Sequence, residues 1–261
     1  TGGGKTEAYL GLTAYTLAIR RLQGIVEGHS GQSGVAVLMR YTLRLLTLQQ
    51  FQRAAALICA CERIRQEAMA GGDARWGAEP FRLGLWVGGT STPNSTEASA
   101  DALKSSGGPR RGTPYQLTTC PWCGSEIKPD RHLRVEPYER GRGRTLMFCG
   151  DPLGQCPFTE RNSGGEGIPA VVVDEEVYRL LPALLIATVD KFAQMPWKGE
   201  TQMLFGRVNS YCSRHGFGSP DLNCGESHRA AGTLPATRTA PAGPLRPPVR
   251  YRPAECPAQA S

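Results

Sequence analysis

The chain has 261 residues, enough for one large domain or two small ones, and its net charge of +7 permits a nucleic-acid partner without requiring one. We find neither a signal peptide nor an uncharged apolar run long enough to span a bilayer, so we expect a soluble, cytoplasmic protein with no membrane partner. The nine cysteines are clustered, which in a cytosolic protein favours metal binding over a disulfide framework.

The chain opens with six residues typical of the end of a phosphate-binding loop, G-x-x-x-x-G-K-[ST]: Thr1, Gly2, Gly3, Gly4, Lys5 and Thr6. In such a loop, backbone N–H groups surround the phosphates of a nucleotide, and glycines let the backbone approach them. We expect Lys5 to contact the β- and γ-phosphates of ATP and the Thr6 hydroxyl to bind Mg²⁺. The alternative is a flexible glycine-rich tail, but the helical pattern that follows favours nucleotide binding.

An amphipathic helix is predicted directly after this loop, because five apolar residues recur at helical spacing on one face: Ala8, Leu12, Tyr15, Ile19 and Leu22. The glycine- and serine-rich stretch 24–34 then predicts a loop. The continuous apolar run 35–39 is typical of a buried parallel strand.

A long helix is predicted over about 42–70, with a buried side marked by Leu45, Leu48, Phe51, Ala55 and Ile58. Cys59 and Cys61 are two residues apart on this helix and point in different directions, so we interpret them as small core residues and not as ligands. A further strand is predicted at 83–87. Loop–helix, strand–helix, strand is the order of an α/β P-loop domain with a parallel sheet.

A family resemblance appears after the first predicted strand. The strand and the residues after it resemble the second conserved motif of superfamily 2 helicases: Thr42, Leu45, Leu46 and Gln49. In that family this motif contacts the backbone of the nucleic-acid strand, which implies such a role for Thr42, Arg44 and Gln49. A hydroxyl and arginines at a helix N-terminus also suit phosphate on physical grounds. The alternative is that Arg40 and Arg44 only cap and solubilise a surface helix.

The composition changes at Gly88, and 88–112 predicts a mobile loop or linker with a short helix near 98–103. A Cys-x-x-Cys-Gly knuckle follows, and together with two later cysteines it predicts a structural zinc site of four thiolates: Cys120, Cys123, Cys149 and Cys156. The alternative is a redox Cys-x-x-Cys pair, which normally opens a helix after a strand, a pattern absent here.

Five arginines lie between the two cysteine pairs: Arg131, Arg134, Arg140, Arg142 and Arg144. They form a basic ribbon that could lie on nucleic-acid phosphates. Because Glu136 and Glu139 interleave with them, a solvated hairpin face is an equal alternative.

The apolar run 170–173 ends in Asp174-Glu175, as a Walker B strand does, but no Asp-Glu-x-His or Asp-Glu-x-Asp pattern follows. We therefore interpret it as a strand or loop without catalytic residues. The run 184–188 predicts another buried strand, and Thr188 after it resembles the helicase motif in which a Thr at a helix N-terminus binds the strand backbone. Lys191 is expected to add a phosphate contact.

The combination resembles one branch of superfamily 2, the DISARM anti-phage helicases or DrmA-like proteins. The resemblance covers 1–222 and is carried by 1–7, 40–50, 83–94, the four cysteines and 181–193. It implies an ATP-driven motor acting on nucleic acid in bacterial defence, with DNA favoured over RNA and with defence subunits as further partners. It also implies a RecA-like motor domain over 1–90 and 166–222, with a flexible linker and zinc-ribbon-like insertion over 91–165.

The region 223–261 consists mainly of Ala, Pro, Arg and Gly and is expected to be disordered. Our hypothesis is a frameshift in GC-rich coding DNA, because out-of-frame GC-rich codons yield mainly these residues. The alternative is a genuine disordered tail.

Hydrolysis of ATP needs a Walker B carboxylate pair, an arginine finger and a second RecA domain, none of which the sequence supplies. We therefore assign no catalytic residue and expect this chain alone to be a poor ATPase, although its parent would be an ATP-dependent helicase. Two other classes remain: a P-loop enzyme that is not a helicase, such as a kinase, and a non-enzymatic zinc module that binds nucleic acid.

Overall fold

The computed structural model describes residues 4–41, 44–104, 112–138, 142–212, 214–219 and 240–241, with only the backbone of 44–47 and 240–241. The described helices are α1 (Lys5–Gln23), α2 (Arg44–Ala70), α3 (Thr96–Lys104), α4 (Pro129–His132), α5 (Asp174–Leu180), α6 (Val189–Gln194) and α7 (Thr201–Leu204), with 3-10 turns at Ala74–Trp76 and Met195–Trp197. The described strands are β1 (Ile25–Val26), β2 (His29–Ser30), β3 (Val37–Tyr41), β4 (Leu83–Trp86), β5 (Leu133–Glu136), β6 (Arg144–Met147), β7 (Ala170–Val171), β8 (Leu184–Thr188), β9 (Ser210–Cys212), β10 (Gly216–Gly218) and β11 (Ala240–Pro241).

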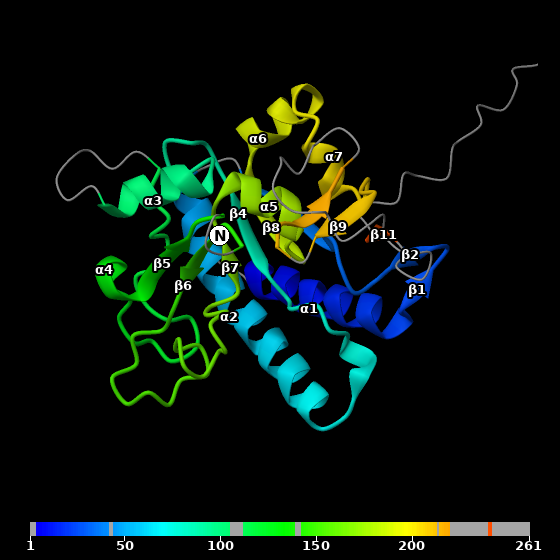
Figure 1. The fold of residues 1–261 in the computed structure, drawn as a ribbon. Coiled ribbons are helices and arrows are strands. Elements are labelled where there is room, and N and C mark those ends of the chain that lie inside the picture. The colour runs from blue at the N-terminus through cyan, green and yellow to red at the C-terminus, as the bar shows by residue number, and fades with distance from the viewer. Residues whose placement is uncertain are drawn as a thin grey trace, which may run out of the picture.

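Four parallel strands form the central sheet in the order β3-β8-β4-β7 (Figure 1). Leu184 of β8 lies opposite Val37 of β3 on one side and Leu83 of β4 on the other. Every residue of β4 and β8 is buried, as expected of parallel strands covered on both faces. The predicted strands at 35–39, 83–87 and 184–188 correspond to β3, β4 and β8, so the predicted α/β class with a parallel sheet is confirmed.

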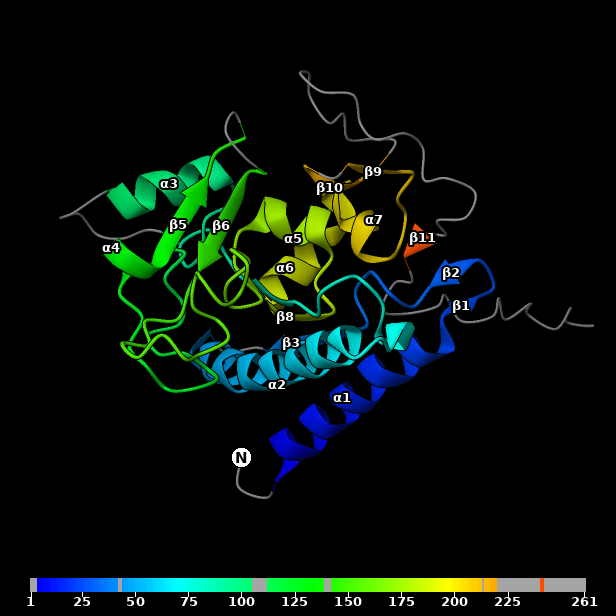
Figure 2. The same cartoon turned by 60° about the horizontal axis from the view of Figure 1, so that its bottom comes forward.

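The sheet separates two hydrophobic cores, because successive side chains of a strand point to opposite faces. Leu184 and Ile186 of β8 belong to the first core, on the side of α1 and α2, whereas Leu185 and Ala187 belong to the second. The second core is completed by side chains of α5 and α7, among them Val177, Met203 and Leu204. Figure 2 shows the resulting layers, with α1 and α2 on one side of the sheet and α5 and α6 on the other.

The long helix α2 agrees with the prediction, and Phe51, Ala55 and Ile58 are buried in the first core. Leu48 is partly buried against the same core. The side chain of Leu45 lies outside the described part of the chain.

The buried face of α1 differs from the one predicted. Leu12 and Tyr15 are 63% and 65% exposed, and Leu22 is 48% exposed, whereas Thr13, Leu17 and Arg21 are buried. Arg21 is held by tertiary contacts: its guanidinium lies over the Phe81 ring at 4.3 Å and donates to the Trp76 carbonyl at 2.9 Å. These contacts turn a partly polar face of the helix inward and leave its apolar face outside.

The cysteine-rich region packs directly on the central sheet and α2. Its antiparallel β5–β6 hairpin contacts α3, and Leu117, Ile127 and Phe158 lie in the first core together with residues of α2. The stretch 88–112, expected as a mobile loop or linker with a short helix near 98–103, contains that helix as α3, and Ser91 and Thr92 before it are buried. The Asp174 and Glu175 backbone N–H groups bond to carbonyls of this stretch, which fixes it against α5.

The predicted tail over 223–261 lies outside the described residues except for β11, which pairs in parallel with β2. Among the described residues, no helix combines the length and apolar character needed to cross a lipid bilayer.

Candidate functional site

The residues predicted to bind nucleotide lie at the start of α1, although Thr1, Gly2 and Gly3 are outside the described part. Gly4 has a φ of 68°, a left-handed conformation that suits glycine, and its carbonyl accepts the Ala8 N–H at 3.0 Å. The helix therefore begins at Lys5, whose side chain is exposed, while Thr6 is partly buried. An exposed lysine at a helix N-terminus is an arrangement that can hold an anion. Binding of ATP and Mg²⁺ here stays a prediction.

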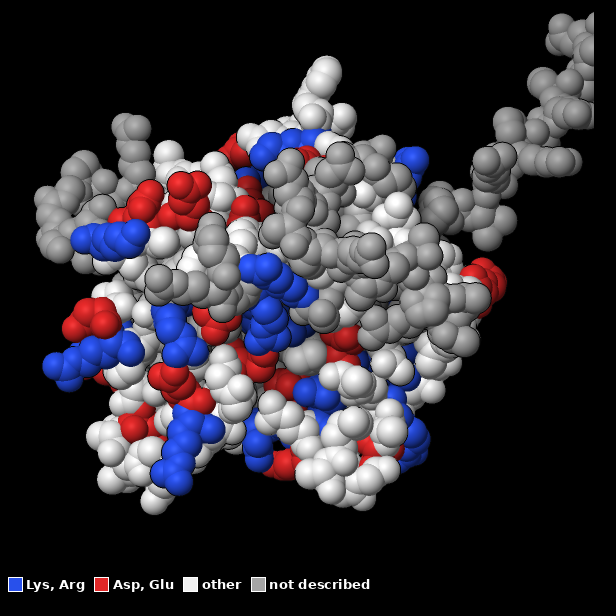
Figure 3. Space-filling view, viewed as in Figure 1, with Lys and Arg blue, Asp and Glu red and all other residues white. Residues whose placement is uncertain are grey.

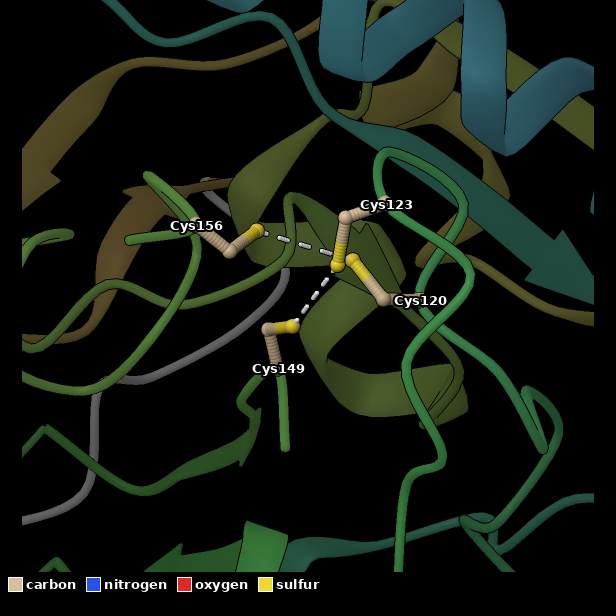
Figure 4. A group of neighbouring side chains, drawn as sticks. All are labelled: Cys120, Cys123, Cys149 and Cys156. Atoms are coloured by element: carbon tan, nitrogen blue, oxygen red, sulfur yellow. Dashed lines mark hydrogen bonds between the residues drawn. The ribbon is translucent and has the colours of Figure 1, made fainter. Parts of the chain in front are cut away.

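Four cysteine side chains from separate segments converge in one cluster (Figure 4), and they are the four predicted: Cys120, Cys123, Cys149 and Cys156. Their sulfur atoms all lie within 4.8 Å of one another. The Sγ atoms of Cys123 and Cys149 are 3.4 Å apart, and those of Cys120 and Cys156 are 3.9 Å apart. Zinc bound to four sulfurs at about 2.3 Å requires sulfur–sulfur separations of about 3.8 Å, whereas a disulfide requires about 2.0 Å. The cluster therefore has the dimensions of a metal tetrahedron.

The first cysteine pair is positioned by a tight turn. The Gly124 N–H donates to the Cys120 carbonyl at 2.9 Å, and the Cys120 N–H donates to the Ser125 carbonyl at 2.8 Å. Gly124 has a φ of 78°, which a residue with a side chain adopts only with strain. The turn thus brings both thiols of the Cys-x-x-Cys-Gly motif to one side, as the sequence predicted.

The second pair depends on Asp151, which sequence analysis did not single out. Its carboxylate accepts the N–H groups of Leu153, Gln155 and Cys156 at 3.0, 2.8 and 2.8 Å. These bonds fold the six-residue loop between Cys149 and Cys156 and compensate for its unusual length. An Asp just after the third cysteine, followed by glycine-containing sequence, was the available signal, because such a side chain commonly bonds to nearby backbone in turns.

The pKa values of the thiols indicate that a bound metal would be needed to keep all four cysteines ionised. Burial raises the pKa of the Cys149 thiol well above its usual range and that of Cys156 to about 12. Cys123 is more exposed, and although burial raises its pKa, hydrogen bonds with Ser125 lower it to about 7. A bound cation would stabilise all four thiolates, because a metal ligand must be deprotonated.

The cluster is closed rather than open to substrate. Cys120, Cys149 and Cys156 are buried in the first core, and Cys123 is exposed. With four sulfur ligands no position remains for water, which is the arrangement of a structural zinc site. Cys59 of α2 is buried next to this cluster and Cys61 is partly buried, which agrees with their predicted role as core residues.

Among the residues predicted to contact nucleic acid, the structure describes the side chains of Gln49, Thr188 and Lys191. Thr42 and the side chain of Arg44 lie outside the described part, and Gln49 is exposed on α2. Thr188, at the carboxyl end of β8, is buried, and its hydroxyl has no hydrogen-bond partner in the described part of the protein. Figure 3 shows basic side chains interleaved with acidic ones over the face of the molecule that is seen in Figure 1.

Lys191 is 3% exposed and forms a buried ion pair with Asp174. Its ammonium also lies 5.7 Å from the centre of the Trp86 ring. In this geometry the Lys191 ammonium is engaged by Asp174, and the phosphate contact expected from the sequence stays a prediction. The pair could not be recognised from sequence, because its partners lie on α5 and α6 and meet only when both pack on the sheet.

The acidic run at the start of α5 is held by structural contacts. Glu175 accepts the Thr96 N–H at 2.8 Å and Glu176 accepts the Thr145 N–H at 2.8 Å, while Asp174 pairs with Lys191. These bonds fasten α3 and β6 to α5. They give the run a role that does not involve a nucleotide.

Comparison with known proteins extends these observations. No protein-family model matches the chain. DISARM protein DrmA of Bacillus paralicheniformis is 36% identical to it over 258 residues, which cover 95% of this chain and 21% of that relative. The chain is thus similar to DISARM protein DrmA over nearly all of its length and spans about a fifth of that relative.

Proposed function

We propose that this chain is an ATP-binding part of a superfamily 2 helicase or translocase motor that acts on DNA in bacterial anti-phage defence. The observation that carries the proposal is the start of α1, where a helix begins at Lys5 directly after a left-handed Gly4. The similarity to DISARM protein DrmA supports the defence role. The cytoplasm, where phage DNA arrives, is the corresponding location, and other defence subunits are the corresponding protein partners.

The parallel sheet supports a motor domain larger than this chain. Among the described strands, β3 pairs only with β8 and leaves its other edge open. The apolar face of α1 is also exposed, and more than 60% of the surface of Leu12 and of Tyr15 is accessible to solvent. An open parallel edge and an uncovered apolar helix face are surfaces that further strands of a motor domain would cover.

The residues then divide by role. Lys5 and Thr6 would hold the phosphates and Mg²⁺ of bound ATP, which supplies the energy for movement. Thr42, Arg44, Gln49 and Thr188 would lie near the nucleic-acid backbone. The four cysteines would hold zinc, which would fix the β5–β6 region against α2 and the sheet without taking part in hydrolysis.

The test is binding of Mg²⁺–ATP to this chain, measured by calorimetry. Lys5→Ala should weaken binding about tenfold or more, because it removes a charge-assisted contact to phosphate. Lys104→Ala is the matched control, since Lys104 is a similarly exposed lysine on a different helix, and its affinity should equal that of the unmodified chain. Equal affinity of the Lys5 variant and the unmodified chain would refute the proposal.

A second function is favoured by the assembled cysteine cluster: a non-enzymatic zinc module that binds nucleic acid. It predicts salt-sensitive DNA binding that survives Lys5→Ala but is lost with Cys120→Ser and on chelation. The motor proposal instead predicts that ATP changes the affinity for DNA and that Lys5→Ala removes this effect. Measuring DNA affinity with and without ATP therefore separates the two.

A further inference from the structure

A small hollow of about 40 Å³ lies where β6, α5 and the β9–β10 hairpin meet. Its basic lining residues are five arginines from distant parts of the chain: Arg82, Arg142, Arg144, Arg179 and Arg214. The carboxylate of Glu79 also lines it. With Glu166, which lies beside three of these arginines, five guanidinium groups face two carboxylates.

One carboxylate is shared by three of the guanidinium groups. Arg144 Nη1 donates to Glu166 Oε2 at 2.6 Å, Arg142 pairs with Glu166 Oε1, and Arg82 Nη2 lies 3.9 Å from Glu166 Oε2. Burial raises the pKa of Glu166, but Arg144 and Arg142 outweigh it and lower this pKa to about 2. Burial and the neighbouring Arg144 lower the pKa of Arg82. The carboxylates of Glu79 and Glu166 together do not balance the charge of five guanidinium groups.

Two of the arginines each have a buried N–H group without an acceptor among the described residues. Arg144 is 6% exposed and Arg179 is 8% exposed, and the Nε atom of each has no hydrogen-bond partner among the described residues. A buried donor without an acceptor costs free energy, and a bound anion or water is one way to supply the acceptor.

The backbone around the hollow is built to hold these arginines. Gly143 has a φ of 61°, a Cβ there would meet the Tyr138 ring at 2.3 Å, and its carbonyl accepts a bond from Arg179. Gly216 of β10 has a φ of 87°, and a Cβ there would lie 2.3 Å from the Arg179 carbonyl. Both glycines permit a close approach that a larger residue would prevent. Arg179 is thus held between Gly143 and the β9–β10 hairpin.

We propose that this arginine pocket binds a phosphate group, either inorganic phosphate or the terminal phosphate of an oligonucleotide. Guanidinium forks match phosphate oxygens, and a doubly charged anion offsets most of the excess charge. The hollow admits a few water-sized atoms, which suits one small group and excludes a nucleoside. The pocket is separate from the cysteine cluster, because Arg144 begins β6 and Cys149 follows its other end.

The test is a calorimetric titration of the zinc-bound chain with inorganic phosphate in a chloride buffer. We expect saturable binding at one site. Arg142→Gln, at a half-exposed position, should weaken it about tenfold, equivalent to 1.4 kcal/mol. Glu166→Gln should strengthen it, because the competing carboxylate is removed. Arg131→Gln, at an exposed arginine outside the pocket, is the control and should change nothing.

The source of the phosphate is decided with two oligonucleotides of one sequence, one 5′-phosphorylated and one ending in a 5′-hydroxyl. Tighter binding of the phosphorylated strand, lost in Arg142→Gln, identifies an oligonucleotide end. Saturable binding of inorganic phosphate without this preference identifies free phosphate. Absence of saturable phosphate binding would overturn the proposal. An equal loss in Arg142→Gln and Glu166→Gln would overturn it as well, because that pattern indicates collapse of the network.

Discussion

The most instructive perturbation is Glu176→Gln, because Glu176 is a fully buried carboxyl at the junction of α5 and β6. Its Oε1 accepts the Thr145 N–H at 2.8 Å and lies 3.5 Å from the Thr96 hydroxyl. Burial raises the pKa of Glu176 to about 7, although Arg179, Arg144 and Thr145 act to lower it. A carboxyl whose pKa rises from its ordinary 4.5 to about 7 costs the folded state about 3 kcal/mol once it is ionised.

The sign follows from proton linkage. The unfolded chain releases this proton near pH 4.5 and the folded chain only near pH 7, so between these values the folded state holds the extra proton. The contribution of Glu176 to the free energy of unfolding therefore falls as the pH rises from 4.5 to 7 and is constant above that. Glutamine keeps the acceptor for Thr145 and never ionises. The variant should match the unmodified chain near pH 4.5 and be about 3 kcal/mol more stable at pH 8.

The assay is urea denaturation of both proteins from pH 5 to pH 8, with tryptophan fluorescence as the signal and zinc content checked at each pH. Only the difference between the two proteins is interpreted, so the pH dependence of thiol ionisation and metal binding cancels. A difference that does not change with pH, or a variant that is less stable at pH 8, would refute this reasoning.

Two further outcomes test the site and the fold. The purified chain should contain one zinc per molecule by elemental analysis. Cys149→Ser should lose the metal and much of its stability, whereas Cys61→Ser, at a cysteine outside the cluster, should keep both. Zinc retained by the Cys149 variant would contradict the site. Leu17→Ala should lower the free energy of unfolding by about 2–5 kcal/mol because Leu17 is buried. Leu12→Ala should change it by about 0.5 kcal/mol or less because Leu12 is exposed. A larger loss of stability in the Leu12 variant than in the Leu17 variant, measured by denaturation, would show that the buried face of α1 was assigned incorrectly.

The sequence determined the main elements because their patterns are local. The runs at 83–87 and 184–188 are continuous apolar segments, as expected of parallel strands that are buried on both faces. The structure has β4 and β8 at these positions. The cysteine cluster could be predicted for a similar reason. Thiols are rarely grouped without a shared function, and a Cys-x-x-Cys-Gly turn places two of them together whatever the rest of the chain does.

Tertiary structure alone decided which groups meet across the sheet. The face of α1 that is buried depends on Arg21 reaching Phe81 and Trp76, and no periodicity within the helix contains that contact. The pairing of Lys191 with Asp174, and the meeting of Arg82, Arg144 and Arg179 around one hollow, join residues far apart in the chain. Charged groups make such contacts only where packing excludes water and fixes their partners, so the sequence supplied the residues and the fold determined their chemistry.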